Sequence, residues 1–356
     1  MSRPVESDAI AVSRPRLGFA GVGWIGLDRL RRIAAAGDAE IACIVDPAVE
    51  AARRAAEAAQ CAACAPVRIG DRFEALLDSE LDGIVIATPS GLHAEQARAA
   101  LEQGISVFCQ KPLARTAEEA RSVVEAARRC DRLLAVDFCY RTVAGVPHLA
   151  ELVRGGALGE VYAIDLTFHN AYGPDKPWFY DQAQSGGGCV MDLGIHLVDL
   201  LLWALDYPRI VSVSSRLHSG GERLERGQAG AREQAGARGA ASLEDHAFAQ
   251  IELETGATAR LACSWRLPAG CDAVIGAAFY GTRGAAILRN VEGSFYDFVV
   301  EHCEGTVRRV LASPPDEWSG RAACAWARRL ARDASFDRQA LGLVEVSRVI
   351  DAIYAP

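Results

Sequence analysis

Short apolar runs alternate with helical patterns through the first 140 residues. Each run is bounded by turn signals and predicts a buried strand, at 16–20, 40–45, 82–88, 105–109 and 133–136. Apolar residues at helical spacing predict a helix after each of the first four strands, ending near residues 36, 59, 104 and 130. Strands that alternate with helices are typical of a parallel sheet covered on both faces.

The pattern changes after about residue 140. We expect a helix at 146–154, a strand at 160–169, a loop at 173–185 and a strongly apolar helix at 190–205. Several strand-like segments follow between 210 and 312, and two helices close the chain, at about 317–332 and 340–354. The chain is therefore predicted to be α/β, with an α+β second domain built on a large open, mostly antiparallel sheet.

Length and charge narrow the class of protein. A chain of 356 residues, half of them hydrophobic, suggests two domains with sizeable cores. A formal net charge of −8 indicates no basic face for nucleic acid. No apolar run reaches membrane-spanning length, and the N-terminal segment lacks the apolar core of a secretory signal. We therefore expect no nucleic-acid partner and no membrane association.

The 11 cysteines lie in apolar contexts without a regular framework, which is typical of reduced thiols in a cytoplasmic protein. Cys61 and Cys64 form a single C-x-x-C pair. Without a second pair we expect no metal site, and a redox dithiol stays the alternative.

A glycine turn follows the first predicted strand and opens a helix. Gly21, Gly23 and Gly26, with Trp24 and Ile25 between them, have the G-x-G-x-x-G spacing of a dinucleotide-binding turn. Such glycines permit a tight turn and let a pyrophosphate approach the helix N-terminus. An ordinary glycine turn is the alternative, but an acidic residue after the second strand completes the fingerprint.

That acidic residue is Asp46, which lies 20 residues after Gly26. Its carboxylate can accept hydrogen bonds from the adenosine ribose and would repel a 2′-phosphate. We therefore expect NAD rather than NADP, although Arg53 and Arg54 keep NADP as an alternative. The organisation predicted from these patterns is a flexible leader at 1–14, a Rossmann domain at 15–138 and a second domain at 139–356, with a flexible insertion at 219–243.

Polar residues follow the third predicted strand, at the edge where ligands bind in such sheets. We expect Thr88, Pro89, Ser90 and His93 to contact the cofactor. Helix capping is the alternative for Ser90 and equally for His93.

Gln110, Lys111 and Pro112 follow the fourth predicted strand. Because this is again the cofactor edge of the sheet, we expect Gln110 and Lys111 to lie beside the cofactor. A solvated loop lysine is the alternative.

The helix predicted at 190–205 is apolar nearly all round, yet it carries Asp192, His196 and Asp199. These residues share one face at helical spacing, and an unpaired buried charge is costly, so that face must meet polar partners. Three glycines at 186–188 permit a backbone or a ligand to come close. We expect an active-site helix, and the alternative is an Asp–His pair satisfied within the core.

Together these motifs resemble the Gfo/Idh/MocA oxidoreductases, a family named for glucose–fructose oxidoreductase and inositol dehydrogenase. The resemblance extends from Gly21 to the closing helix and rests on the glycine turn, the Lys111–Pro112 step and the G-G-G…D-x-G-x-H pattern at 186–196. The family usually has Glu-Lys-Pro where this chain has Gln110 before the lysine, which bears on the charge state of Lys111 and on the ribose contact.

The resemblance implies that Lys111, Asp192 and His196 surround the nicotinamide and the reacting carbinol. An imidazole titrates near neutral pH, so His196 is the expected base for the hydroxyl proton. Asp192 is expected to orient the substrate or His196, and Lys111 to stabilise the alkoxide-like oxygen. Asp199 is expected to be structural.

Candidate substrate contacts lie near the loop at 168–181, which mixes polar and aromatic residues as sugar sites do. The candidates are Arg141, Asn170, Tyr172, Asp175, Lys176 and Trp178. A surface loop with buried aromatic anchors is the alternative.

The expected function is NAD-dependent oxidation of a secondary alcohol of a sugar, inositol or related polyol. The alternatives are an NAD-dependent glycosidase that oxidises its substrate transiently and a sugar-sensing regulator. The presence of Lys111, Asp192 and His196 speaks against the regulator. An apolar sheet face that the helices leave open usually finds a partner, so we expect a homodimer or homotetramer.

Overall fold

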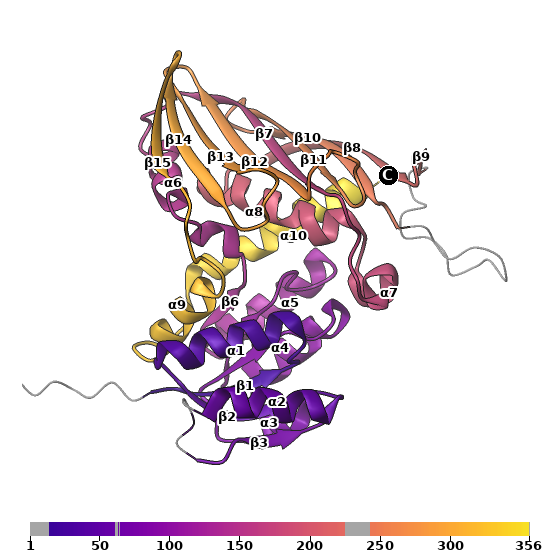
Figure 1. The fold of residues 1–356 in the computed structure, drawn as a ribbon, viewed down its shortest axis with the longest axis vertical. Helices are drawn as coiled ribbons and strands as arrows, with labels where there is room; N and C mark the ends of the chain where they lie inside the picture. The colour runs from indigo at the N-terminus through magenta and orange to yellow at the C-terminus, as the bar shows by residue number, and fades with distance from the viewer. Residues whose placement is uncertain (1–13, 61–62, 64, 225–242, 356) are drawn as a thin grey trace, which may run out of the picture.

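The computed structural model describes residues 14–60, 63, 65–224 and 243–355. Most of the predicted leader (1–13), the Cys61/Cys64 pair and most of the predicted insertion (225–242) lie outside the described residues. Two units stack along the long axis of the molecule, and each contains one sheet (Figure 1). The predicted α/β class is confirmed.

The first unit contains a six-stranded parallel sheet with the order β3-β2-β1-β4-β5-β6. Its strands are β1 (Arg16–Ala20), β2 (Glu40–Val45), β3 (Arg68–Gly70), β4 (Gly83–Ile86), β5 (Ser106–Cys109) and β6 (Leu134–Val136). The helices between them are α1 (Trp24–Ala36), α2 (Val49–Ala59), α3 (Glu74–Leu77), α4 (His93–Glu102) and α5 (Ala117–Arg129). The strand order reverses between β1 and β4, and ligands bind beyond the carboxyl ends of strands at such a reversal.

Two short elements, β3 and α3, have no counterpart among the predictions. β3 has three residues, none of them buried, and α3 has four residues with only Leu76 buried. Elements this short carry too few apolar positions to show a period.

The helix α9 (Arg321–Leu330) packs on the first unit, although we expected it within the second domain at 139–356. Trp326 and Leu330 are buried in the same core cluster as Leu17 and Phe108. The rings of Phe108 and Trp326 lie 5.6 Å apart, centre to centre. The predicted boundary therefore needs correction, because the chain returns to the first unit after building the second sheet.

The second unit contains a nine-stranded sheet with the order β15-β14-β13-β12-β7-β11-β10-β8-β9. Its strands are β7 (Val161–Asn170), β8 (Ile210–Ser219), β9 (Glu222–Arg223), β10 (His246–Leu253), β11 (Thr258–Ser264), β12 (Ala273–Gly281), β13 (Ala285–Asn290), β14 (Phe298–Glu304) and β15 (Val307–Ala312). The β7–β11 pair is parallel and the other pairs are antiparallel. The prediction of a large, mostly antiparallel sheet is confirmed, and the start of the predicted insertion forms the β8–β9 hairpin.

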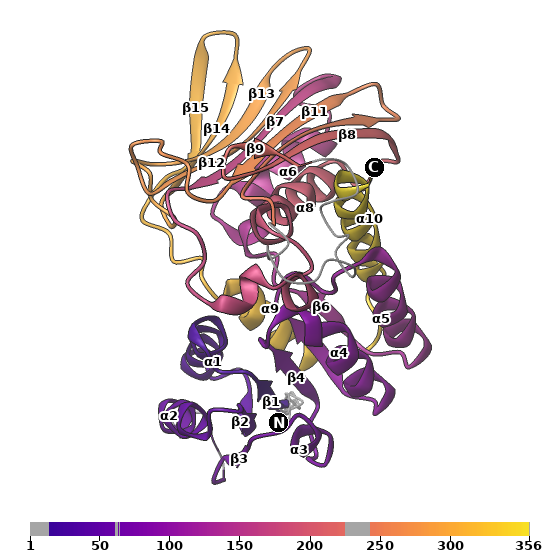
Figure 2. The same ribbon diagram turned by 90° about the vertical axis from the view of Figure 1, so that its right-hand side faces the viewer.

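Helices α6 (Val146–Arg154), α8 (Ile195–Ala204) and α10 (Gly342–Tyr354) lie on the side of this sheet that faces the first unit (Figures 1 and 2). By length and composition, the helical segment Gln182–Ala204 could cross a membrane, which the sequence analysis did not anticipate. However, 89% of its apolar window is buried inside the protein, so it contacts protein on nearly every side. That burial is typical of a core helix.

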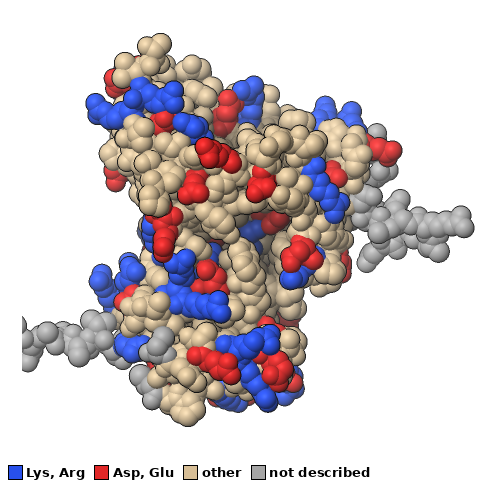
Figure 3. Space-filling view, in the orientation of Figure 1, with Lys and Arg blue, Asp and Glu red and all other residues tan. Residues whose placement is uncertain are grey.

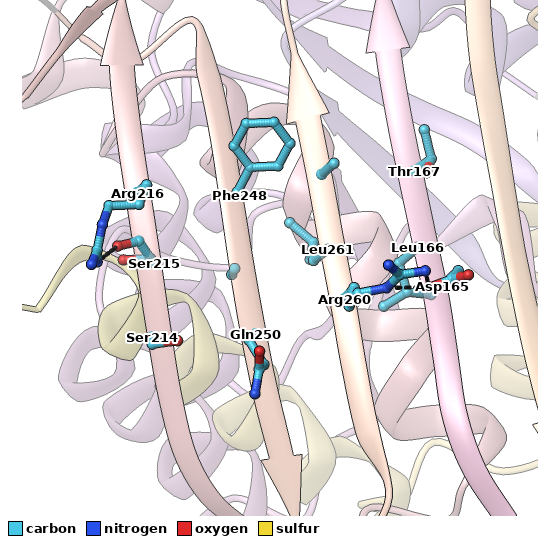
Figure 4. A pocket seen from close by; sticks show the side chains of 12 residues that line it. Asp165, Leu166, Thr167, Ser214, Ser215, Arg216, Phe248, Gln250, Arg260 and Leu261 are labelled. Carbon is cyan, nitrogen blue, oxygen red and sulfur yellow. Dashed lines mark hydrogen bonds and ion pairs between the residues drawn. The ribbon is translucent and has the colours of Figure 1, made fainter.

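The outward face of the nine-stranded sheet is open. In β10, Ala247 and Ala249 are buried, whereas Phe248 between them is 51% exposed. A shallow groove of about 580 Å³ crosses this face beside Phe248, and the Arg260–Asp165 ion pair lies in it (Figure 4). On the face of the molecule shown in Figure 3, positive and negative side chains are interspersed.

Candidate active site

The glycine turn between β1 and α1 is shaped for close approach. Gly21 has a φ of +83°, and a Cβ at Gly26 would lie 2.1 Å from the carbonyl oxygen of Gly21. A Cβ at Gly23 would meet no atom within 4 Å, and no side chain caps α1. The first-turn N–H groups can therefore receive an anion, which fits the pyrophosphate of a dinucleotide. Trp24 is 73% exposed and Ile25 is half-buried beside the turn.

Asp46 lies beside this turn, directly after β2. Its Oδ2 accepts a hydrogen bond from Val22 N at 2.9 Å and its Oδ1 accepts one from Ala48 N at 2.8 Å. Each carboxylate oxygen can accept a further bond, so ribose hydroxyls can still bind. Arg53 lies 3.4 Å from Glu50 in an exposed ion pair.

His93 ties two loops together rather than presenting its ring to a ligand. It is 1% exposed, with Nδ1 2.7 Å from Pro112 O and Nε2 2.7 Å from Thr88 O. Burial and the charge of Lys111 lower the pKa of His93. Both ring nitrogens face backbone carbonyl oxygens, which favours a positioning role, and the predicted cofactor contact stays a prediction.

The other three residues of this loop stay at the cofactor edge. The hydroxyl of Thr88 donates to Gln96 Oε1 at 2.7 Å. Pro89 precedes the short 3-10 helix η2 (Ser90–Leu92), and Ser90 is 5% exposed. Its side chain caps neither η2 nor α4, so the capping alternative is not what the structure shows.

Lys111 and Asp192 come from the two different units and meet in an ion pair. Lys111 follows β5, and its Nζ donates to Asp192 Oδ1 at 2.6 Å and to Asp192 O at 2.7 Å. Trp265 Nε1 donates to the other carboxylate oxygen at 3.0 Å. Both oxygens of Asp192 are thus engaged, and the ammonium of Lys111 keeps one N–H for a ligand.

His196 lies one turn beyond Asp192, among aromatic rings. The ring centres of Tyr140, Phe168 and Phe138 are 5.0, 6.2 and 6.4 Å from that of His196. Its Nδ1 is buried and has no hydrogen-bond partner among the described residues. Burial, and then the charge of Lys111, lower the pKa of His196 well below 6.5. The imidazole is therefore neutral near physiological pH and can accept a proton.

The alternative of a satisfied Asp192–His196 pair is not what the structure shows, because Asp192 binds Lys111 and Trp265 instead. The helix also departs from a single regular stripe. It begins with a π-helical turn, η5 (Val190–Gly194), before α8. Such turns occur frequently at functional sites.

The glycine run before this helix makes room for protein groups. A Cβ at Gly187 would lie 2.1 Å from the hydroxyl oxygen of Tyr354, and one at Gly188 would lie 2.0 Å from the carbonyl oxygen of Glu244. Glu244 Oε1 accepts hydrogen bonds from Gly188 N, Val190 N and the hydroxyl of Tyr354, at 2.9, 3.1 and 2.6 Å. Burial raises the pKa of Glu244 to about 7. This carboxylate therefore anchors the start of the helix.

Asp199 and Arg141 form a buried ion pair farther along α8. Arg141 Nε donates to Asp199 Oδ2 at 2.8 Å, and its Nη2 donates to Asp199 Oδ1 and to the hydroxyl of Tyr207. The pair raises the pKa of Arg141 despite its burial. The pairing of Asp199 with Arg141 is consistent with the structural role expected of Asp199. Nε and Nη2 of Arg141 are thus engaged within the protein, and the predicted substrate contact of Arg141 stays a prediction.

Among the described residues, no hydrogen bond or ion pair joins the predicted loop contacts to Lys111 or Asp192. Asn170 ends β7 with its Oδ1 buried and unpartnered among the described residues. The hydroxyl of Tyr172 donates to Asp272 Oδ1 at 2.5 Å, and Trp178 stacks on Phe179. Their role in substrate binding stays a prediction. The exposed neighbours Asp175 and Lys176 pair with each other at 2.8 Å.

The sequence analysis missed Trp265, which binds Asp192, and the pair of Tyr180 and Arg266 beside it. Trp265 follows β11 and holds Asp192, and the ring of Tyr180 lies 5.7 Å from that of Trp265. Arg266 Nη2 donates to the hydroxyl of Tyr180 at 3.0 Å. The one signal in the sequence is that a buried indole needs an acceptor for its N–H. Which carboxylate accepts is decided by folding.

Two curated proteins show how far the likeness extends. D-glucoside 3-dehydrogenase of Escherichia coli (strain K12) is 32% identical over 215 residues, covering 60% of this chain and 60% of that protein. Inositol 2-dehydrogenase 3 of Saccharopolyspora erythraea is 27% identical over 332 residues, covering 87% of this chain and 90% of that protein. The match thus spans less than two thirds of the length of the first relative.

The fold is shared with solved structures. Levoglucosan dehydrogenase in complex with NADH and L-sorbose superposes with a TM-score of 0.76 at 19% identity, over 96% of each chain. Another solved structure with this fold holds NADP. At such identity the likeness shows the fold alone.

Two family models together cover most of the chain. The model described as "Oxidoreductase family, NAD-binding Rossmann fold" matches residues 16–138. The model described as "GFO/IDH/MocA C-terminal domain" matches residues 146–287. The chain, with its Rossmann unit and its large mixed sheet, belongs to the Gfo/Idh/MocA family of oxidoreductases.

Proposed function

We propose that this protein is an NAD-dependent dehydrogenase that oxidises a secondary alcohol of a sugar, an inositol or a related polyol. The observation that carries the proposal is the meeting of Lys111 with Asp192, 2.6 Å apart, beside the neutral His196. The names of the curated relatives, dehydrogenases of a glucoside and of inositol, support this substrate class.

The residues at the cofactor edge fit a dinucleotide. The turn at 21–26 would receive the pyrophosphate on uncapped N–H groups, and Asp46 would accept hydrogen bonds from the adenosine ribose. The nicotinamide, when bound, would accept a hydride from the carbinol carbon. The chain itself must place the hydroxyl and move its proton.

His196 is the base in this proposal. Its Nδ1 is buried among aromatic rings and has no hydrogen-bond partner among the described residues. Its Nε2 is not sealed in this way. The lone pair for the hydroxyl proton is therefore on Nε2, and Nδ1 keeps the ring proton. The proton passes to Nε2 as the carbinol carbon is oxidised.

Lys111 stabilises the negative charge that develops on the substrate oxygen. Two of its N–H groups are bound to Asp192, so the third can donate to that oxygen. Asp192 is itself held by Trp265. We therefore assign Asp192 to orienting Lys111 rather than His196.

The proposed preference for NAD over NADP rests on Asp46. A 2′-phosphate would meet this carboxylate. Of the two candidate phosphate partners, Arg53 is paired with Glu50 and Arg54 is exposed, so NADP stays the alternative.

A panel of sugars and inositols incubated with NAD tests the proposal, with formation of NADH followed by absorbance. We expect at least one polyol to yield NADH and ketone in equal amounts. Activity should be strongly reduced in Lys111→Ala and kept in His148→Ala, which changes an exposed histidine of α6. Cleavage of a glycoside without net NADH would support the glycosidase instead. Absence of NADH with every polyol would refute the dehydrogenase.

A further inference from the structure

Gln110 and Asp137 form a buried pair next to Lys111. Gln110 directly follows β5 and Asp137 directly follows β6, which is the neighbouring strand. Gln110 Nε2 donates to Asp137 Oδ2 at 2.6 Å. The two residues are 7% and 1% exposed. Their backbones are also fixed, since Gln110 N donates to Ile86 O and Asp137 N donates to Cys109 O, each at 2.8 Å.

Arg29 supplies the cation that balances Asp137. Its Nε donates to the same Oδ2 at 2.6 Å, and Arg29 is 3% exposed. Arg29 Nη1 reaches Asp28 Oδ2 and the hydroxyl of Ser319, at 2.5 and 3.0 Å. An ionised carboxylate at position 110 would face that of Asp137, and two buried like charges at this distance are unfavourable. The cluster therefore requires a neutral donor at position 110.

Asp137 also decides which way the amide of Gln110 points. An ionised carboxylate only accepts hydrogen bonds, so Nε2 must face Asp137 and Oε1 must face away. Among the described residues, none donates a hydrogen bond to Gln110 Oε1, and this oxygen is not sealed inside the protein. Gln110 lies at the carboxyl end of β5, on the ligand edge of the sheet.

We infer that Asp137 is a positioning residue, which orients the amide of Gln110 so that its acceptor oxygen, Oε1, faces the cofactor edge. The pair presents one neutral acceptor, Gln110 Oε1, to a ribose hydroxyl of the bound dinucleotide and keeps the negative charge one strand away. Lys111, the next residue in the chain, has Asp192 as its carboxylate partner. The inference rests on the proposed function only in taking a dinucleotide as the ligand.

An exchange of the two side chains tests this pairing. In Gln110→Glu, like charges meet, so we expect a lower melting temperature without cofactor and roughly tenfold weaker NAD binding, with partial recovery at acidic pH. Asp137→Asn removes one of the two carboxylates that pair with Arg29, so this variant should also melt lower. The double variant Gln110→Glu/Asp137→Asn restores one carboxylate facing one amide. It should regain most of the wild-type melting temperature and NAD affinity.

Two further variants sharpen the result. Gln103→Glu adds the same charge at an exposed site after α4 and should melt and bind like wild type. Gln110→Met removes the acceptor without adding charge and should weaken NAD binding about tenfold.

The pairing is overturned if Gln110→Glu behaves like Gln103→Glu, or if the double variant is no better than Gln110→Glu. If Asp137→Asn does not fold, comparison of Gln110→Glu with the double variant still decides. Wild-type NAD affinity in Gln110→Met, or no NAD binding by wild type, would overturn the cofactor contact. Failure of the proposed function would look different. The melting temperatures and NAD affinities of the four proteins would follow the expected pattern, but no polyol would yield NADH.

Discussion

The hydroxyl of Tyr354 donates a 2.6 Å hydrogen bond to Oε1 of Glu244, and this pair holds the start of the helix that carries Asp192 and His196. The same oxygen of Glu244 accepts from Gly188 N and Val190 N. One buried carboxylate, just before β10, thus joins the last helix, α10, to the start of the active-site helix. Loss of these hydrogen bonds should therefore disturb Asp192 and His196, although Glu244 is not itself a proposed ligand contact.

Glu244→Ala should lower both stability and turnover. Two buried N–H groups and a hydroxyl would lose their acceptor, at a cost of about 2–5 kcal/mol in the free energy of unfolding. Turnover per folded molecule should fall because Asp192 shifts with the helix. Glu244→Gln keeps an acceptor oxygen and is the matched control. Denaturant unfolding and steady-state rates would show both effects, and wild-type turnover in the alanine variant would contradict the anchoring role.

Asp46→Ser should narrow the preference for NAD over NADP. The hydroxyl of serine removes the negative charge that would meet a 2′-phosphate. Affinities for NADH and NADPH, measured by titration of wild type and variant, test this expectation. Tighter binding of NADPH than NADH by wild type would show that Asp46 does not select the cofactor.

His196→Ala should reduce turnover by roughly two to four orders of magnitude. NAD affinity should be nearly unchanged, because the dinucleotide would be held by the turn at 21–26 and by Asp46 in the other unit. Asp199→Asn, in contrast, should act mainly on the melting temperature through the loss of its charge beside Arg141. Full activity in the folded fraction of His196→Ala would remove His196 from the mechanism.

Activity in the oxidation direction should persist below pH 6.5. A base must be unprotonated, and burial together with Lys111 lowers the pKa of His196 below 6.5, so the neutral ring survives to lower pH. The acid limb of the kcat/KM profile should therefore lie below that value. In Lys111→Met the residual activity should show this limb at higher pH, because the neighbouring positive charge is gone. A wild-type limb at or above 6.5 would contradict the assignment.

The outward face of the nine-stranded sheet should mediate assembly into a homodimer or homotetramer. Phe248, 51% exposed beside the groove, is the residue most able to pack on a second copy. Phe248→Glu should shift the mass measured by light scattering toward the monomer, because the interface would bury an unpaired charge. Ile69→Glu, an exposed apolar position in the first unit, is the control. A monomeric wild type at micromolar concentration would reject this assembly.

Residues close in sequence carried most of what could be predicted. Strand–turn–helix patterns located β1, α1 and Asp46, since a short apolar run, three spaced glycines and an acidic residue each have a local physical cause. The glycines at 186–188 did not indicate which groups would approach them. They do permit close approach, but the groups that approach are Glu244 and Tyr354, which no local pattern could pair with them.

From the sequence, we could predict the two kinds of sheet, the buried helix that carries His196 and Asp199, and the place of Lys111 beyond the carboxyl end of a strand, because periodicity and local turn chemistry set each of these. Only the tertiary structure decided the partners. Asp192 binds Lys111 and Trp265, Asp199 binds Arg141, and Gln110 binds Asp137, across separations of 81, 73, 58 and 27 residues. A buried charge must find a counter-charge or a donor, but which one it finds depends on how strands and helices far apart in the chain are brought side by side.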